Sequence, residues 1–384
     1  MWAQSTFETT LKTGSENTAL YLPQLKGKKI GIIANATSVI RKKTAGQHTH
    51  LVDSLIKSGI TVVKIFSPEH GFRIAADAGE KVASQIDTKT GLPIISLYGS
   101  HRKPTADDLK EVDLLVFDIQ DVGVRFYTYI ATLQYVMEAA AEMDIPILVL
   151  DRPNPNGAII DGPVMEEENK SFLGLQSIPL VYGMTIGEYA LMLQGENWLK
   201  TTKKPQLTVI PMRNYARDFR YDLPIKPSPN LPNKQAIGLY PSLGLFEGTV
   251  INAGRGTTLP FQQFGSKDLD PAVFPHRYTP ESVEGAKNPK QLGTICYGED
   301  LSGVTLPDHV CLKWIIKAYK HHSSEFFLSD SFRLHSGQSQ LEELIRSGKS
   351  ESEIRKTWSA GIEQFKAIRK DYLLYPEADL SLQP

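Results

Sequence analysis

The sequence has little of what would mark a membrane, nucleic-acid or disulfide-rich protein. Its 384 residues contain only two cysteines, Cys296 and Cys311, which are too few for a disulfide framework and lack the partners of a zinc site. The 42 basic and 43 acidic residues nearly cancel, at a net charge of -1, whereas nucleic-acid proteins normally carry a basic surplus. No apolar run approaches the roughly 18 residues of a membrane helix. We therefore expect a globular protein whose cysteines form one disulfide or remain two buried thiols.

Short apolar runs alternate with helical patterns through the first part of the chain. Runs that we expect to be buried strands lie at residues 29–35, 61–66, 93–97, 113–117 and 146–150. Helical spacing occurs between them: Leu51, Leu55 and Ile56 share one face, and a longer stripe begins at Ile130 and continues through Leu133, Met137 and Ala140. This alternation predicts an α/β domain with a parallel sheet covered on both faces.

A proline-rich stretch separates this first part from the rest. Four prolines between Leu223 and Pro232 exclude a helix or a central strand and favour an extended connector. We therefore predict an α/β domain over residues 1–225 and a smaller α+β domain over 226–384. In the second domain we expect a strand at 293–297 and helical stripes such as the one spanning 354–365.

Polar residues directly follow four of the expected strands. Asn35, Glu69, Asp118 and Asp151 each lie within a few residues of a strand's carboxyl end. In open parallel sheets this edge holds the ligand, although Asn and Asp also commonly start turns and cap helices. The repeated position favours a binding site over capping alone.

Residues 67–73 read Ser-Pro-Glu-His-Gly-Phe-Arg. Adjacent side chains on a turn can both enter one crevice, so Glu69 is a candidate general acid or base. His70 and Arg73 are available to tune its pKa. The alternative is a surface turn whose charges are solvated.

The connection between the fourth strand and its helix is unusually rich in polar and aromatic residues. Asp118, Gln120, Arg125, Tyr127 and Tyr129 form a set that can bind a polyhydroxyl ligand, since tyrosine offers an apolar face and a hydroxyl. Arg125 can grip a carboxylate in a bidentate manner. A buried ion pair between Asp118 and Arg125 is the structural alternative.

Two further segments add candidate binding residues. After the fifth strand, two prolines and a glycine fix an irregular loop, from which Asp151, Arg152 and Asn154 are the site candidates. Farther on, Glu247 and Arg255 lie among glycines and turn-forming residues, where they can form a cleft wall. Neither segment has the phosphate-binding fingerprints of nucleotide enzymes.

These four segments, in this order, resemble the NamZ-type exo-β-N-acetylmuramidases, bacterial enzymes of cell-wall recycling. The similarity extends through Tyr182–Glu188 and Lys226–Asn230 and is strong over residues 28–265. It implies a Rossmann-like amino-terminal domain, a smaller carboxy-terminal domain and an active cleft between them, to which Asn230 would contribute. One departure is Ile74, which stands where the family usually has glycine.

The resemblance also implies an activity, the removal of N-acetylmuramic acid from the non-reducing end of peptidoglycan fragments, with Glu69 as the catalytic carboxylate. We expect Glu69 to protonate the leaving oxygen with help from His70. The second catalytic group is open between a carboxylate, Asp118 or Glu247, the N-acetyl group of the sugar oriented by Asp118, and Tyr127.

Substrate recognition needs a cation for the lactyl carboxylate that distinguishes muramic acid from glucosamine, and we expect Arg125 or Arg152 in this role. The predicted partner is thus a muramic-acid-containing saccharide, without a cofactor, a metal or nucleic acid. Rival hypotheses are a sugar-binding protein without turnover, a nucleotide-dependent transferase, and a metal-dependent hydrolase using Glu69, His70 and Asp118.

The compartment is a separate question. Residues 1–5 show no basic region and no apolar stretch, so no complete export signal is visible. From the family we expect an extracytoplasmic location, periplasmic or secreted.

Overall fold

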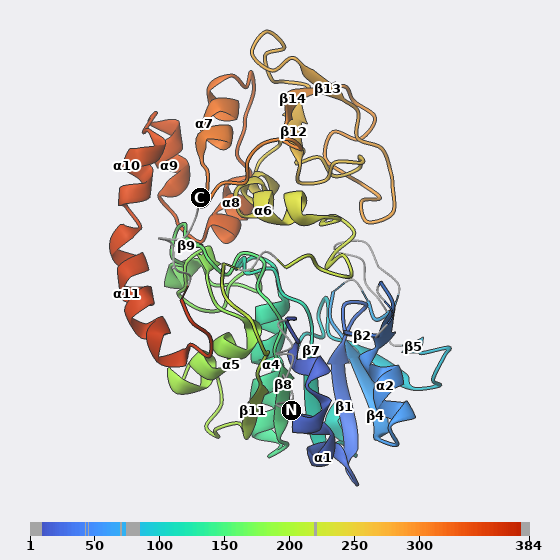
Figure 1. The fold of residues 1–384 in the computed structure, drawn as a ribbon. Helices are drawn as coiled ribbons and strands as arrows, with labels where there is room; N and C mark the ends of the chain where they lie inside the picture. The colour runs from blue at the N-terminus through green and yellow to red at the C-terminus, as the bar shows by residue number, and fades with distance from the viewer. Residues whose placement is uncertain are drawn as a thin grey trace, which may run out of the picture.

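The fold is given by a computed structural model that describes residues 10–42, 44, 46–69, 71–73, 85–218 and 221–377. Two of the residues singled out above, His70 and Ile74, lie outside the described residues. Figure 1 shows a lower part built on a large sheet and an upper part with a small sheet and several helices.

The large sheet has seven strands in the order β11-β8-β7-β1-β4-β6-β5. Its parallel strands are β1 (Lys29–Ala34), β4 (Thr61–Ser67), β6 (Pro93–Ser96), β7 (Leu114–Asp118), β8 (Ile147–Leu150) and β11 (Leu207–Ile210). The edge strand β5 (Gln85–Ile86) pairs antiparallel with β6. All five predicted strands are present, so the parallel α/β prediction is confirmed.

Counted along the chain, the parallel strands lie in the spatial order 3-2-1-4-5-6. This is the order of doubly wound sheets, in which the chain reverses direction across the sheet between the first and fourth parallel strands, here β1 and β7. The crevice at the carboxyl ends of these strands is where such folds bind ligands.

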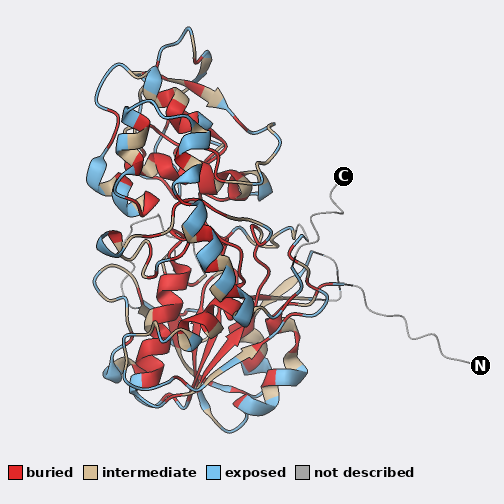
Figure 2. Ribbon diagram, turned by 90° about the vertical axis from the view of Figure 1, so that its left-hand side faces the viewer, coloured by how far each residue is buried: buried red, intermediate tan, exposed pale blue. Residues whose placement is uncertain are grey.

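Helices bury both faces of the sheet. On one face, Ile30 and Ile32 of β1 pack in a core with residues of α1 (Thr18–Leu25) and α2 (Leu51–Lys57). On the other, Ile33 shares a core with α4 (Tyr129–Glu142) and α5 (Ile186–Gly195). Figure 2 shows the strands of this sheet mostly in the colour of buried residues.

The helical stripes are largely as predicted. The stripe of α4 is wholly buried, as are Leu51 and Leu55 of α2, whereas Ile56 is 41% exposed and its predicted place on the buried face was wrong. The stripe over 354–365 is buried but belongs to two helices, because the chain leaves the helical pattern near Trp358.

The second part contains an antiparallel sheet in the order β12-β14-β13, formed by β12 (Gln263–Ser266), β13 (His276–Tyr278) and β14 (Cys296–Asp300). Its helices are α6 (Lys234–Leu243), α7 (Lys313–Lys320), α8 (Ser329–Ser336), α9 (Leu341–Arg346), α10 (Glu351–Lys356) and α11 (Ser359–Arg369). The strand expected at 293–297 therefore begins later, at Cys296. Both cysteines are buried free thiols.

Shorter elements complete the described chain. The strands are β2 (Val39–Arg41), β3 (His48–His50), β9 (Ile160–Asp161) and β10 (Val181–Tyr182), and α3 (Ala106–Leu109) is a single helical turn. The 3-10 turns are η1 (Gly14–Glu16), η2 (Glu167–Asn169), η3 (Gly244–Gly248) and η4 (Lys370–Tyr372). None of the described helices is long and apolar enough to cross a bilayer.

The carboxy-terminal segment returns to the first part of the chain. In Figure 1, α11 runs down beside that part and ends near α5. Arg369 donates from Nη2 to the carbonyl of Gly183 over 2.7 Å, and the Tyr375 hydroxyl donates to Asp151 over 2.6 Å. The division at residue 225 stays a prediction, and the last helix and the residues after it pack across it.

Candidate active site

A cavity of about 390 Å³ lies between the carboxyl edge of the large sheet and the second part. Its wall combines loops that leave the sheet with α6, η3 and the end of α8. The residues lining it are Glu69, Tyr98, Arg102, Phe126, Tyr127, Thr128, Tyr129, Ser171, Phe172, Leu173, Ser228, Asn230, Leu231, Tyr240, Glu247, Arg255, Phe261, Leu334 and His335.

Glu69 follows β4 by two residues and is held from the neighbouring loop. Its Oε2 accepts a hydrogen bond from Thr128 Oγ1 at 3.2 Å, and its carbonyl accepts one from the Tyr129 hydroxyl at 3.3 Å. That hydroxyl in turn accepts from Asn35 Nδ2 at 2.9 Å. The predicted residues Asn35, after β1, Glu69, after β4, and Tyr129, at the start of α4, thus form one hydrogen-bonded chain.

An aromatic cluster forms one side of the cavity. The rings of Tyr127 and Tyr129 meet edge to face at 4.6 Å, and Tyr240 contacts Phe126 at 5.0 Å and Phe261 at 4.8 Å in the same manner. Such rings give an apolar surface for the face of a sugar, with hydroxyls at its edge.

Tyr127 is poorly suited to act as a nucleophile. Its hydroxyl donates to the carbonyl of Pro227 at 2.7 Å. Burial, with further contributions from neighbouring Tyr129 and Tyr240, raises its pKa well above the ordinary value. The phenol therefore keeps its proton, and its contact instead ties the loop of β7 to the proline-rich connector.

A second carboxylate, Glu247, enters the cavity from η3. Its Oε2 lies 3.0 Å from Nη1 of Arg255. Burial alone would raise the Glu247 pKa, but the neighbouring positive charges, chiefly those of Arg255 and Lys290, outweigh it and hold the pKa below the ordinary value. Glu247 is thus ionised at neutral pH.

Tyr240 relates the two carboxylates to each other. Burial is the main reason that its pKa is raised, and the negative charges of Glu247 and Glu69 both add to the rise. Tyr240, Glu69 and Glu247 all line the same cavity.

His335, at the end of α8, was not predicted from the sequence. Its Nδ1 lies 2.8 Å from the carbonyl of Ser331, one helical turn back. Because a carbonyl only accepts, Nδ1 carries the hydrogen and Nε2 is the acceptor. Burial lowers the pKa of His335, so the imidazole is neutral at neutral pH.

Asp118 does not line the cavity. It is fully buried and forms a bidentate ion pair with Arg152, whose Nε and Nη2 lie 2.6 and 2.8 Å from its two oxygens. Burial raises the pKa of Asp118 against the opposing effect of the guanidinium, and although burial alone would lower the pKa of Arg152, the carboxylate raises it. The proposed Asp118–Arg125 ion pair is not formed.

Arg125 is buried among backbone carbonyls. Its Nη1 donates to the carbonyls of Pro163 and Ile178, and its Nη2 donates to Ser336 at 2.6 Å. Burial lowers its pKa to about 9. Neither Arg125 nor Arg152 lines the cavity, so the structure places neither where it can hold a substrate carboxylate.

Three other predicted residues make internal contacts outside the cavity. Asp151 accepts from the Thr185 hydroxyl at 2.7 Å and from the Gly187 amide at 2.8 Å, at the start of α5. Gln120 donates to the carbonyl of Pro153 at 2.6 Å, and Asn154 donates to that of Met184 at 2.8 Å. These side chains fix the path of the loops at the sheet edge.

A neighbouring cavity of about 350 Å³ is lined by Asn35 and Arg73, among others, and shares Ser228 with the first. Arg73 is ion-paired with Asp53 at 2.6 Å and with Asp87 at 2.9 Å. Asn230 lines the main cavity and donates to the carbonyl of Gly285 at 2.7 Å.

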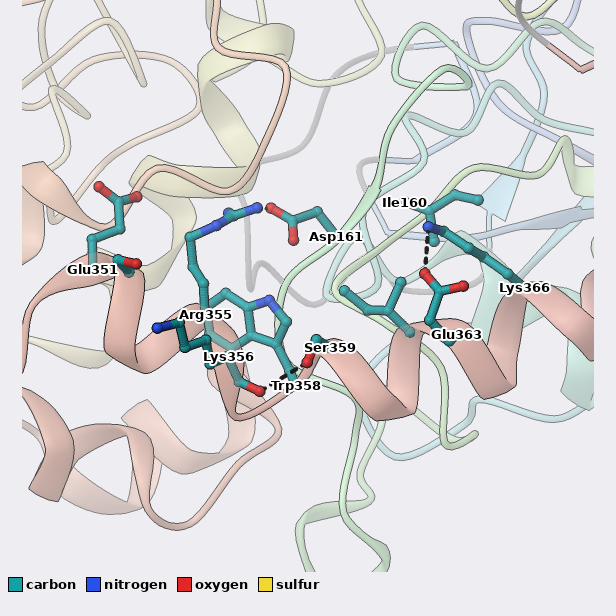
Figure 3. A pocket seen from close by; sticks show the side chains of 11 residues that line it. Ile160, Asp161, Glu351, Arg355, Lys356, Trp358, Ser359, Glu363 and Lys366 are labelled. Atoms are coloured by element: carbon teal, nitrogen blue, oxygen red, sulfur yellow. Dashed lines mark hydrogen bonds and ion pairs between the residues drawn. The ribbon is translucent and has the colours of Figure 1, made fainter.

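Larger hollows lie elsewhere on the molecule. Figure 3 shows one of about 590 Å³ between β9 and the helices α10 and α11. Its charged side chains largely pair with each other, as Arg355 does with Asp161 at 2.5 Å and Lys366 with Glu363 at 2.8 Å. A third hollow, of about 440 Å³, lies beside the proline-rich connector. Size alone does not mark the site. Among the described lining residues, each of these two hollows has one aromatic side chain, Trp358 or Tyr221, whereas seven tyrosine and phenylalanine side chains line the cavity that contains Glu69 and Glu247.

One group of side chains in the described part of the chain has the composition of a metal site. The ligand atoms of His309, Cys311 and Glu351 lie within 4.8 Å of one another, away from the cavity. Of the different set considered above, Glu69 lines the cavity, Asp118 does not and is paired with Arg152, and His70 lies outside the described residues.

The chain matches known proteins along most of its length. Residues 30–235 match the N-terminal model of the exo-β-N-acetylmuramidase NamZ family, and residues 238–375 match its C-terminal model. The peptidoglycan β-N-acetylmuramidase NamZ of Bacillus subtilis (strain 168) is 40% identical, over 92% of this chain and 89% of that protein.

Two solved structures of DUF1343 family proteins from Bacteroides fragilis NCTC 9343 have the same fold. One is 44% identical with a TM-score of 0.87 and covers 96% of this chain and 100% of its own. The other is 30% identical with a TM-score of 0.78 and covers 95% and 99%. On sequence and fold together, this chain belongs to the exo-β-N-acetylmuramidase NamZ family.

Proposed function

We infer that this protein is a glycosidase, an exo-β-N-acetylmuramidase that removes terminal β-linked N-acetylmuramic acid from the non-reducing end of peptidoglycan fragments. The observation that carries this inference is the cavity, in a chain of this family, that Glu69 and Glu247 line together with several tyrosine and phenylalanine rings. Glycoside hydrolysis commonly uses two carboxyl groups around the scissile bond. The proposed reaction takes place there, with the sugar against the tyrosines.

Glu69 is the proposed general acid. Its hydrogen bond from Thr128 orients the carboxyl group, and the bond from Tyr129 fixes the backbone that carries it. A general acid in this position would donate its proton to the glycosidic oxygen as the bond to the leaving sugar breaks.

Glu247 is the proposed second carboxylate. Its lowered pKa keeps it ionised, as a general base or nucleophile requires, and it lines the same cavity as Glu69. Asp118 is less suited to this role because both of its oxygens are engaged by Arg152. In the alternative mechanism, the substrate's N-acetyl group is the nucleophile and Glu247 is not needed. The activity of a Glu247→Gln variant distinguishes the two mechanisms.

The test is hydrolysis of a chromogenic N-acetylmuramide by Glu69→Gln and Glu247→Gln. We expect kcat to fall about 10²- to 10⁴-fold in the first, the usual contribution of general acid–base catalysis. A fall of similar size is expected in the second. Glu363→Gln, in the outer hollow of Figure 3, is the matched control and should keep full activity.

Three outcomes would contradict the proposal. Near-full turnover by folded Glu69→Gln would show that Glu69 is not the general acid. Near-full turnover by Glu247→Gln would favour participation of the N-acetyl group. A wild-type protein that binds a muramyl disaccharide but releases no N-acetylmuramic acid would be a binding protein, and the enzymatic proposal would fail.

A further inference from the structure

Selecting muramic acid over glucosamine requires a cation. The two sugars differ by a lactyl ether that carries a carboxylate, and arginine binds carboxylates through two parallel hydrogen bonds. This inference rests on the proposed function, and it asks which cation of the cavity meets that carboxylate now that Arg125 and Arg152 are engaged elsewhere.

Among the described residues that line the cavity, three have basic side chains: Arg102, Arg255 and His335. Arg255 is paired with Glu247 at 3.0 Å, so its charge is already neutralised by a group of the protein. His335 is neutral at neutral pH, because burial lowers its pKa. Arg102 forms no ion pair with any residue that the structure describes.

Arg102 is nevertheless held in place by an aromatic stack. Its Cζ lies over the ring of Phe172 at 4.3 Å from the centroid. The ring of Phe172 is also stacked with that of Tyr135, with centroids 6.2 Å apart and an interplanar angle of 6°. A cation–π contact positions the guanidinium without using its N–H groups, so these donors stay available for an anion.

The segment that carries Phe172 is itself a defined turn. Ser171 and Gly174 exchange backbone hydrogen bonds of 3.1 and 2.9 Å. A side chain at Gly174 would meet Arg125 Cδ at 2.9 Å, so the buried arginine packs beneath the turn. Arg125 thereby supports the platform on which Arg102 rests.

We propose that Arg102, stacked on Phe172 at the cavity, determines specificity by binding the lactyl carboxylate of the muramyl residue. It lies in the loop between β6 and α3, on the sheet side of the cavity with Glu69. Arg102 is thus a substrate-binding residue that distinguishes a muramide from a glucosaminide.

The test compares Arg102→Gln with the wild type on three chromogenic substrates: an N-acetylmuramide, its lactyl methyl ester and an N-acetylglucosaminide. A hydrogen-bonded charge pair of ordinary strength predicts a loss of about 10- to 100-fold in kcat/KM on the muramide, mainly through KM. The two uncharged substrates should change less than about threefold. Arg102→Lys should recover part of the loss.

Arg277→Gln is the matched control. Arg277 is likewise exposed and lies over an aromatic ring, that of Tyr297 at 5.1 Å, but outside the cavity. All three substrates should be cleaved by this variant as by the wild type.

Binding provides a readout that does not depend on turnover. In calorimetry, Arg102→Gln should lose affinity for N-acetylmuramic acid and not for N-acetylglucosamine. If the wild type cleaves no muramide, the proposed function fails while this comparison still tests Arg102. Equal losses on charged and uncharged ligands would overturn the proposal, as would unchanged muramide affinity or a charge-selective loss in Arg255→Gln instead.

Discussion

At the scale of single residues, the polar side chains that follow the strands show what the sequence can and cannot predict. Asn35 and Glu69 gather around Tyr129, whereas Asp118 and Asp151 are buried and make internal contacts. Asp118 meets an arginine 34 residues away. A polar residue after a strand looks the same in sequence whether its partner is a ligand or a distant internal side chain.

Asp121 is a buried carboxyl without a cationic partner in the described chain. Its Oδ2 accepts from the Tyr182 hydroxyl and from the Gly123 amide, while its Oδ1 has no hydrogen-bond partner. Burial raises its pKa from 3.8 to about 6, against the opposing effect of these hydrogen bonds. Folding therefore becomes less favourable as the pH rises through this window, because the unfolded chain releases the proton first.

We expect Asp121→Asn to remove this pH dependence. An amide keeps an acceptor for both donors and never ionises. The free energy of unfolding of the variant should rise relative to wild type by about 3 kcal/mol between pH 4 and pH 7, at about 1.4 kcal/mol for each pH unit between the two pKa values. Urea unfolding at several pH values measures it. A difference that does not vary with pH would show that Asp121 is ionised in the folded state at pH 4.

At the scale of elements, continuous apolar runs predicted five strands, and apolar residues spaced by three or four positions predicted the buried face of α4. Strand β11 was not predicted, because its short run Leu207–Ile210 is interrupted by Thr208 and is only partly buried. The stripe predicted over 354–365 joins α10 and α11, because Trp358 continues the spacing across the break. Apolar spacing reports burial, and it does not report where the backbone leaves the helix.

Gly337 caps the carboxyl end of α8, the helix whose last turn lines the cavity through Leu334 and His335. Its φ is +76°, and a Cβ there would lie 2.3 Å from Nη2 of Arg125. The same φ occurs at Gly348, where no atom lies within 4 Å of a Cβ. The two positions therefore separate the cost of the left-handed backbone from that of displacing the arginine.

We expect Gly348→Ala to cost about 1 kcal/mol of unfolding free energy, for the backbone conformation alone. Gly337→Ala should cost about 1–3 kcal/mol more, because it disturbs the hydrogen bonds of Arg125. It should also lower kcat/KM, since His335 and Leu334 immediately precede the turn. Urea unfolding and the muramide assay measure both effects. Equal costs at the two glycines would contradict the role given to Arg125.

At the scale of the whole molecule, the cavity exists because two distant parts of the chain meet over the sheet edge. Glu69 comes from the end of β4, while Tyr240 and His335 come from helices more than 160 residues farther on. Neither Tyr240 nor His335 could be predicted from local sequence, because neither lies in a motif that differs from an ordinary helix. The resemblance to a family predicted a cleft, and the packing of α6 and α8 determines what lines it.

The most direct measurement is a crystal structure of Glu69→Gln soaked with a muramyl disaccharide. Our account predicts that the terminal sugar lies against Tyr127 and Tyr240, with the glycosidic oxygen within hydrogen-bond distance of the substituted side chain and the lactyl carboxylate on Arg102. Electron density for the disaccharide in another hollow, with the cavity empty, would contradict it.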